Sequence, residues 1–278
     1  AGAAKPLAGG REKILLHWMG DERGNHIDEC NVTPLAIAIG SQLLHATGLA
    51  WASKYKKDGA IACTFFGDGA TSEGDFHEAA NFAANLDLPV VFVCQNNGWA
   101  ISTPTKLECS APTVAQRGIA YGMDCIQVDG NDLFAMVKVV KDAVDNARKN
   151  NRPTFIEALT YRLGDHTTAD DARRYRDADE LAMWEKRDPM IRLRNYLEQK
   201  DLWSSVKEEE QLAVAATTVS QVVKNAEEID APTTNDFFDS MYTELPPQLQ
   251  KQRQTLRTSS IGQDPSQIEQ ATQEGVMQ

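Results

Sequence analysis

The residues best suited to chemistry lie at the two ends of one segment, which begins with GDGATSEGDFHEAANFAANL and closes with LPVVFVCQNN. Asp68 directly follows the apolar run AIACTFF, and Asn97 follows the next apolar run along the chain. Mg2+ binds about six oxygen ligands and often shares protein carboxylates with the phosphates of its ligand. A carboxylate and an amide oxygen at these positions therefore predict a magnesium site, provided that the fold brings the two ends together.

The predicted elements between Asp68 and Asn97 are expected to bring these two residues together. Residues 60–66 and 88–95 are apolar runs of strand length, and residues 72–86 form an amphipathic stretch between them. Ligands bind in a crevice at the carboxyl ends of parallel strands, so the acid and the amide should meet there. We expect Ser72 to cap the intervening helix. The apolar face of this helix consists of Phe76, Ala79, Ala83 and Leu86.

A diphosphate is the expected companion of the metal ion. Asp68, the amide oxygen of Asn97 and the carbonyl oxygen of Trp99 would be the protein ligands of Mg2+. Gly67 and Gly69 would let the backbone approach the diphosphate, and the start of the following helix adds free N–H groups and a favourable dipole. A bare GDG is a common turn, so the prediction depends on its combination with NN at this distance.

A second strand–helix–strand unit follows, with strands at 123–130 and 154–162 and a helix at 131–150. The Ala-rich residues 35–53 predict a further buried helix. This alternation predicts an α/β fold, with a parallel sheet and helices on both faces. The helix at 131–150 should bury Leu133, Val137, Val140 and Val144, and the helix at 35–53 should pack closely at Gly40 and Gly48.

After residue 162 the chain changes to a polar loop, LGDHTTADDARRYRD, and then to helical segments. We place one domain over residues 11–250, with these segments as a helical C-terminal extension. Residues 251–278 are rich in Gln, Ser and Thr and are expected to form a flexible tail. The opening AGAAKPLAGG is expected to be a tail or a cut end. The helical segments are 177–187, 189–199 and 206–229.

The composition excludes several classes of protein. A net charge of −12, with basic clusters interrupted by acids, argues against a nucleic-acid partner. The sequence has neither a run of roughly 20 apolar residues nor a secretory leader, so no membrane insertion is expected and the compartment should be a bacterial cytoplasm or a mitochondrial matrix. The 5 cysteines include no CxxC pair and predict reduced thiols, with Cys63 and Cys94 buried in strands.

The segment from Gly67 to Asn97 resembles the thiamin-diphosphate fingerprint, in which GDG and NN are separated by a helix and a strand. Its continuation, QNNGWAISTPT, is similar to the alpha subunits of the pyruvate and branched-chain 2-oxo acid dehydrogenases. The loop YRLGDHTTADDARRYR and the ELPP near Pro246 match the same family. The resemblance runs from about Trp18 to Leu249 and implies the thiamin-diphosphate-binding fold.

This resemblance assigns cofactor contacts. Ile37 and Ile39 match positions that contact the aminopyrimidine, although plain core positions are an equally good interpretation of the residues themselves. His166 matches a loop histidine that reaches the cofactor, transfers protons and helps to deliver the acyl group. The diphosphate and magnesium positions match Gly67, Asp68, Gly69, Ala70, Asn97 and Trp99.

The loop around His166 allows other interpretations. Without the resemblance, His166 is better explained as a solvated loop residue. A second metal site with Asp170 and Asp171 is the weaker alternative, because a loop balanced by arginines is a poor rigid cage. Thr167 occupies the position of a phosphorylated serine in animal relatives. We expect Arg173, Arg174 and Arg176 to pair with Asp165, Asp170 and Asp171.

The resemblance implies an enzyme: the alpha subunit of an alpha2-beta2 2-oxo acid dehydrogenase that uses thiamin diphosphate and Mg2+. It would decarboxylate a 2-oxo acid oxidatively, with pyruvate favoured, and pass the acyl group to lipoamide on a dihydrolipoyl acyltransferase core. The glutamate that activates the cofactor lies on the beta subunit in this family, so no residue of this chain is assigned that role.

Other functions remain open at this stage. Within the same family the substrate could be a branched-chain 2-oxo acid or acetoin. The family's helical N-terminal region, with its Tyr-Arg pair at the diphosphate, is not found in this sequence, which leaves a non-catalytic scaffold subunit as an alternative from another class. An unrelated magnesium-dependent phosphotransferase is disfavoured, because the chain has no P-loop.

Overall fold

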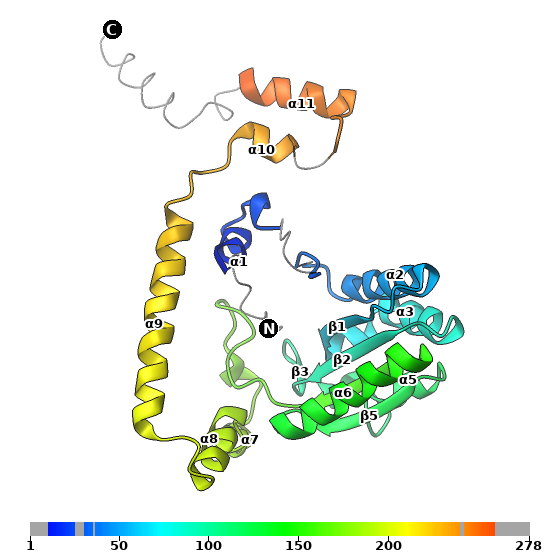
Figure 1. The fold of residues 1–278 in the computed structure, drawn as a ribbon, viewed down its shortest axis with the longest axis vertical. Coiled ribbons are helices and arrows are strands. Elements are labelled where there is room, and N and C mark those ends of the chain that lie inside the picture. Colours follow the sequence, from blue (N-terminus) through cyan, green and yellow to red (C-terminus); the bar gives the residue numbers. More distant parts are fainter. Residues whose placement is uncertain (1–10, 26–30, 36, 240–241, 259–278) are drawn as a thin grey trace. The chain divides into compact units, whose positions relative to one another are not determined.

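The computed structural model describes residues 11–25, 31–35, 37–239 and 242–258 (Figure 1). The chain divides into two compact units, residues 36–205 and the combination of residues 1–35 with 206–278. Within the described part, none of the helices is long and apolar enough to cross a membrane.

A parallel sheet of 4 strands, in the order β1-β2-β6-β5, forms the centre of the unit at 36–205 (Figure 1). The central strand β2 is buried on both faces, which explains its near-continuous apolar sequence. A small antiparallel hairpin, β3 and β4, follows it. The strands are β1 (Ala62–Gly67), β2 (Val90–Asn96), β3 (Trp99–Ala100), β4 (Thr103–Pro104), β5 (Asp124–Asp129) and β6 (Thr154–Leu159).

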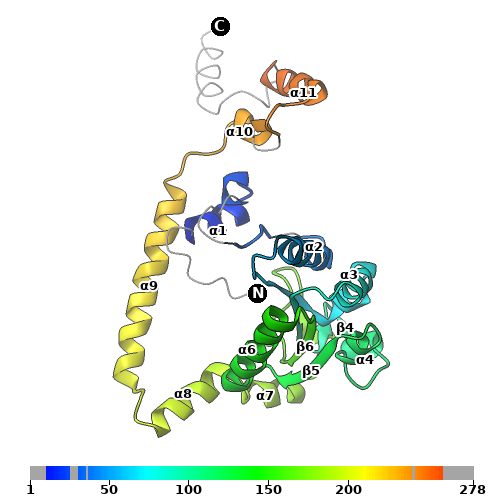
Figure 2. The ribbon, with the colours of Figure 1, turned by 45° about the vertical axis from the view of Figure 1, so that its right-hand side comes forward.

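Helices cover both faces of this sheet, as predicted (Figure 2). On one face α2 (Ser41–Lys56) and α3 (Gly74–Asn85) pack on a core that includes Phe92 of β2. On the other face α6 (Leu133–Asn150) packs on a second core that includes Val91. The apolar face predicted for α3 is confirmed: Phe76, Ala79 and Ala83 are fully buried, and Leu86 packs against the same core.

Two predicted helix starts are wrong. The helix α2 begins at Ser41 rather than at residue 35, because Gly40 takes a left-handed conformation with φ 88°. Gly40 also packs closely, since a Cβ there would lie 3.3 Å from the Cβ of Glu73, whereas Gly48 has open space around it. The helix α3 begins at Gly74, and the predicted cap, Ser72, instead ends the 3-10 turn η2 (Asp68–Ser72).

The buried face of α6 differs partly from the prediction. Val140 and Val144 pack against the core, but Leu133 and Val137 are 47% and 57% exposed. The small residues Ala143 and Ala147 are buried instead and let the helix approach the sheet closely. The side chain of Asp132 caps this helix by accepting the N–H groups of Phe134 and Ala135, each at 3.0 Å.

The cysteines in the described part are free thiols, and Cys30 lies outside it. Cys94 is buried in β2, as predicted. Cys63 is exposed, because β1 is the edge strand and its residue 63 lies on the less covered face.

Short helices complete the unit at 36–205. The helices α7 and α8 start at side-chain caps, Asp177 and Asp188, and match the predicted helical segments closely. These elements are α4 (Thr105–Glu108), α5 (Gln116–Ile119), η3 (Ala172–Arg174), α7 (Ala178–Glu185) and α8 (Pro189–Gln199).

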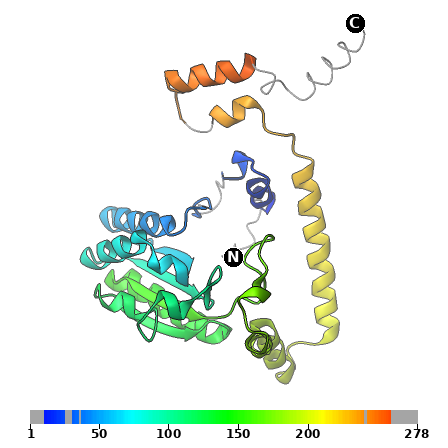
Figure 3. The ribbon, with the colours of Figure 1, turned by 180° about the vertical axis from the view of Figure 1, so that it is seen from behind.

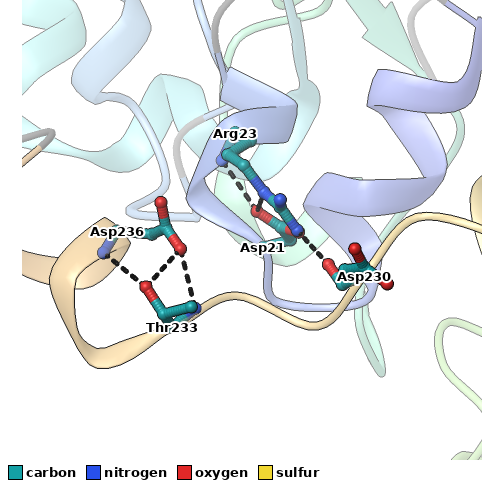
Figure 4. A network of polar contacts seen from close by, with 5 residues as sticks. All are labelled: Asp21, Arg23, Asp230, Thr233 and Asp236. Atoms are coloured by element: carbon teal, nitrogen blue, oxygen red, sulfur yellow. Dashed lines mark hydrogen bonds and ion pairs between the residues drawn. The ribbon is translucent and has the colours of Figure 1, made fainter.

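The other unit joins residues from both ends of the sequence. Arg23 binds the carboxylate of Asp21 and donates to the carbonyl oxygen of Asp230 at 2.5 Å (Figure 4). Further along, Thr233 and Asp236 hydrogen-bond to each other at the start of the helix Thr234–Asp239. Its elements are α1 (Arg11–Trp18), η1 (Glu22–Asn25), α9 (Ser205–Glu227), α10 (Thr234–Asp239) and α11 (Pro247–Thr258).

Within this unit α10 and α11 lie beside each other, and Arg253 pairs with Asp239 at 2.9 Å (Figure 3). The helix α11 runs across residue 251, where we placed the start of a tail. Residues 259–278 lie outside the described part, so the division at 11–250 and 251–278 stays a prediction.

Candidate functional site

The carboxyl ends of β1 and β2 lie side by side, with Gly67 in register with Gln95. Asp68, the residue directly after β1, is only 1% exposed. The hydroxyl of Thr105 donates a hydrogen bond to Oδ2 of Asp68 and lies 3.2 Å from Oδ1 of Asn96. The structure therefore brings the GDG and NN segments together through a threonine that follows the β3–β4 hairpin.

Asn96 is held in turn by a buried acid on the neighbouring strand. Its Nδ2 donates to Oε1 of Glu157 at 2.8 Å, and Oε2 of Glu157 accepts the N–H of Ala115 at 2.8 Å. Glu157 is 1% exposed, so both of its oxygens take part in interior hydrogen bonds. A chain of contacts thus runs from β6 through Asn96 and Thr105 to the carboxylate of Asp68.

Two carboxylate oxygens at this edge have no hydrogen-bond partner although they are buried: Oδ1 of Asp68 and Oε2 of Glu108. Burial raises the pKa of the Glu108 carboxyl, and the negative charge of Asp68 raises it further. Buried carboxylate oxygens without partners are costly unless a cation or a donor compensates them. The arrangement fits a divalent cation, because Asp68 has one oxygen fixed by Thr105 and the other free for a metal ion.

The GDG glycines have different surroundings. Position 67 has open space around it, which a ligand could occupy. A Cβ at position 69 would lie 2.7 Å from the Cβ of Ala100, so glycine is required there by the β3–β4 hairpin. Ala70 is 4% exposed and belongs to the core, so only its backbone is available to a cofactor.

Asn97 and Trp99, the other predicted metal ligands, lie in the turn that enters this hairpin. Oδ1 of Asn97 accepts the N–H of Trp99 at 3.1 Å, which fixes the amide in the turn. The carbonyl oxygen of Asn97 accepts the N–H of Arg162 at 3.2 Å, and the ring of Trp99 lies 5.3 Å from that of Tyr175. The polar loop after β6 is therefore attached directly to the NN turn.

His166 lies on this loop and its side chain is exposed. Its backbone N–H donates to Oδ2 of Asp170 at 2.8 Å, and the hydroxyl of Tyr175 donates to the same oxygen at 2.5 Å. Arg162 joins the loop to the hairpin by donating to the carbonyl oxygen of Ile101 at 2.7 Å and to the hydroxyl of Tyr175 at 2.7 Å. The Tyr175 hydroxyl and then the His166 N–H lower the pKa of the Asp170 carboxyl.

The predicted charge pairing in this loop is only partly correct. Arg173 pairs with Asp171 at 2.7 Å. Arg176 donates instead to carbonyl oxygens, including those of Leu163 and Gly164 at 3.0 Å each. These carbonyl groups belong to a backbone that turns back on itself, and a guanidinium presents enough donors to bind several of them. Asp165 accepts the backbone N–H of Ala172 at 2.9 Å. Within the described residues, no group of three or more His, Cys, Asp and Glu side chains could hold a metal ion.

Ile37 and Ile39 are 86% and 66% exposed in the segment before α2, so the interpretation of both as plain core positions is wrong. Gly40, directly after them, packs against Glu73 at the start of α3.

Several residues of this site were missed in the sequence. One signal was available: Glu157 is an acid in the apolar strand TFIEAL, and a charged residue in a strand buried on both faces needs specific partners. The others have no comparable signal, since their importance depends on the fold. The missed residues are Asn96, Thr105, Glu108 and Glu157.

Comparisons with known proteins agree on one family. A family model described as "Dehydrogenase E1 component" matches residues 7–235. A 3-methyl-2-oxobutanoate dehydrogenase subunit alpha of Mycobacterium tuberculosis (strain CDC 1551 / Oshkosh) is 46% identical over 226 residues, which are 81% of this chain and 61% of the relative.

Two other relatives carry the name pyruvate dehydrogenase E1 component subunit alpha. The one from Acholeplasma laidlawii is 42% identical over 247 residues, which cover 87% of this chain and 71% of that protein. The one from Staphylococcus aureus (strain Mu50 / ATCC 700699) is 43% identical over 242 residues, which cover 86% and 65%. The chain thus spans less than two thirds of the length of the mycobacterial and staphylococcal relatives.

Proposed function

Because this chain belongs to the dehydrogenase E1 component family, we propose that it is the alpha subunit of a thiamin-diphosphate-dependent 2-oxo acid dehydrogenase. The observation that carries this proposal is the buried Asp68, with one oxygen fixed by Thr105 and the other without a partner, at the carboxyl edge of a parallel sheet. The reaction is the oxidative decarboxylation of a 2-oxo acid with transfer of the acyl group to lipoamide.

Pyruvate is the first candidate substrate. Relatives named for pyruvate align with 86% and 87% of the chain. The second candidate is 3-methyl-2-oxobutanoate, because the relative named for it has the higher identity, 46%. The pocket is shared with a beta subunit in the proposed assembly, so the substrate is to be decided by assay.

The residues proposed to hold the cofactor are those that the resemblance to the family assigns. Asp68, Asn97 and the carbonyl oxygen of Trp99 would bind Mg2+. The backbone of residues 67–70 would face the diphosphate, and residues 37 and 39 would face the aminopyrimidine. Thiamin diphosphate, when bound, supplies an electron sink for the loss of carbon dioxide.

The protein's own side chains orient the metal-binding carboxylate and are proposed to exchange protons with the substrate. Thr105 keeps one oxygen of Asp68 in a hydrogen bond, so the carboxylate presents its other oxygen in a single orientation. His166, exposed on a loop attached to the NN turn, is the group proposed to hold a diphosphate oxygen or to exchange a proton with the 2-oxo acid. The Arg162 and Tyr175 side chains keep that loop against the hairpin.

The proposed assembly is an alpha2-beta2 enzyme in the bacterial cytoplasm. The beta subunit would complete the active site with the group that activates the cofactor, and a lipoyl-bearing dihydrolipoyl acyltransferase core would accept the acyl group. This chain alone is therefore expected to be inactive.

The test is dye-linked oxidative decarboxylation by this chain mixed with a candidate beta subunit, thiamin diphosphate and Mg2+. We expect turnover of pyruvate that disappears without the beta subunit and in Asp68→Ala. The control variant is Asp142→Ala, an exposed acid on α6 that should keep full activity. Preference for 3-methyl-2-oxobutanoate would select the second candidate. Failure of the mixture to bind thiamin diphosphate would contradict the proposal and support the scaffold subunit.

A further inference from the structure

A second carboxylate lies beside Asp68. Glu108 ends the short helix α4, which packs against the turn η2 that carries Asp68. Its Oε1 lies 3.8 Å from the position that a Cβ of residue 69 would occupy, and its Oε2 is buried without a hydrogen-bond partner. Glu108 therefore lies beside the GDG turn with a carboxylate oxygen that has no hydrogen-bond partner, and Asp68 has such an oxygen within that turn.

Arg117 fixes the positions of both segments. Its Nη1 donates to the hydroxyl of Thr71 at 2.7 Å and to the carbonyl oxygen of the same residue. Its Nη2 donates to the backbone carbonyl oxygen of Glu108 at 2.5 Å. These donors are directed at Thr71 and at the backbone of α4, so they hold the end of α4 against η2 without hydrogen-bonding to Oε2 of Glu108.

Asp68 is buried and Glu108 is partly buried. Burial and then the negative charge of Asp68 raise the pKa of the Glu108 carboxyl, whereas the positive charge of Arg117 lowers it. Carboxylates held near each other repel unless cations lie near both. Arg117 holds the backbone of Glu108 and Thr105 holds the side chain of Asp68, so the two segments that carry these carboxylates stay next to each other. Such an arrangement is explained if a divalent cation normally compensates both charges, since Mg2+ and Mn2+ prefer carboxylate oxygens.

We propose that Glu108 is a second carboxylate of the cation site, contributing an oxygen to the shell of the divalent ion bound by Asp68. This inference rests on the proposed function, since it adds a residue to the same metal site. The site would then carry the charge of two carboxylates, and it would bind divalent cations more tightly than a site with Asp68 alone.

The experiment is a titration of the full chain, with thiamin diphosphate present, with Mn2+, whose free form is measured by electron paramagnetic resonance. We expect Glu108→Gln to weaken Mn2+ binding by about 10-fold. Glu108→Asp, which keeps the charge, should lie between this variant and the wild type. Glu78→Gln, which removes the same charge from an exposed position on α3, should bind Mn2+ as the wild type does.

The melting temperature without metal separates a cation ligand from a merely structural acid. Glu108→Gln removes a negative charge that Arg117 offsets only in part, so it should raise this melting temperature by about 2 °C. A lower melting temperature in this variant, or unchanged Mn2+ affinity in both Glu108 variants, would overturn the proposal.

Asp68→Asn distinguishes this result from failure of the proposed function. If Asp68→Asn abolishes Mn2+ binding and the Glu108 variants do not weaken it, only the role of Glu108 is rejected. If Asp68→Asn binds Mn2+ as tightly as the wild type, the cation site itself is rejected together with the proposed function.

Discussion

The two halves of the candidate site are built in opposite ways. The half around Asp68 lies at the strand ends, where Asp68 and Glu157 are each 1% exposed and their partners are interior groups. The half around His166 is a loop in which His166 is exposed and Asp170 is half-buried, and its pair of Arg173 with Asp171 lies at the surface.

This difference in burial determines which interactions matter for stability. Interior hydrogen bonds to a carboxylate are expensive to remove because the remaining partner stays buried. Surface ion pairs contribute little, because water and salt screen them and both side chains lose entropy. We infer that the half of the site around Asp68, the metal half, is rigid before any ligand binds. The half around His166 can rearrange at a small cost in free energy when substrate or a lipoyl group binds.

The largest effect is expected for Glu157→Ala. The change removes the acceptor of both Asn96 and the backbone N–H of Ala115, so we expect the free energy of unfolding to fall by about 3 kcal/mol. Urea unfolding measures this value. Glu157→Gln is the matched control, because it keeps the shape and one acceptor oxygen and should lose less. A loss below that of a surface variant would contradict a rigid metal half.

A smaller effect is expected for Thr105→Val, which keeps the shape of the side chain and removes the hydroxyl. Oδ2 of Asp68 then loses its donor, as Oδ1 already lacks one, so the unfolding free energy should fall by about 2 kcal/mol. Thr105→Ser keeps the hydroxyl and should recover most of this loss. Equal stability of the valine and serine variants would show that the hydrogen bond does not hold the carboxylate.

The loop should respond more weakly. Arg162→Ala removes the donor to Ile101 and Tyr175 and is expected to cost about 1 kcal/mol. Its clearer effect should be faster proteolysis within residues 163–176, compared by gel after limited treatment with subtilisin, whose cleavage does not depend on the arginines that the variants remove. Arg173→Ala is the control, since its 89% exposed side chain pairs only at the surface and its loss should stay within about 0.5 kcal/mol. Equal proteolysis of the Arg162→Ala and Arg173→Ala variants would show that Arg162 does not hold the loop.

Much of the fold could be predicted because it depends on local pattern. Continuous apolar runs indicated the strands, and the period of Phe76, Ala79 and Ala83 indicated the buried face of α3. The start of α2 could not be placed, because it depends on the left-handed backbone of Gly40. The face of α6 shifted because the small residues Ala143 and Ala147, rather than Leu133 and Val137, lie closest to the sheet.

The candidate site divides in the same way. Asp68 and the NN turn were predicted to meet because strand order and the crevice rule depend only on topology. Thr105 and Glu157 were missed because they reach the site through contacts between residues 37 and 61 positions apart, for which the sequence gives no periodic signal. Arg176 was assigned to acids because its carbonyl partners exist only in the folded path of the loop.

The smallest predicted effect concerns pH and tests whether the loop is held by Asp170. The pKa of this carboxyl is lowered by the Tyr175 hydroxyl and by the N–H of His166. Since its folded pKa is below its unfolded value of about 3.9, its contribution is present above that pH and is lost as the pH falls through the lowered pKa. Hydrogen exchange at the His166 amide should therefore stay protected down to about pH 4 and lose protection below it. Asp170→Asn should reduce this protection above about pH 4, where the wild-type carboxyl is ionised, and an identical pH profile in the variant and the wild type would show that another group orders the loop.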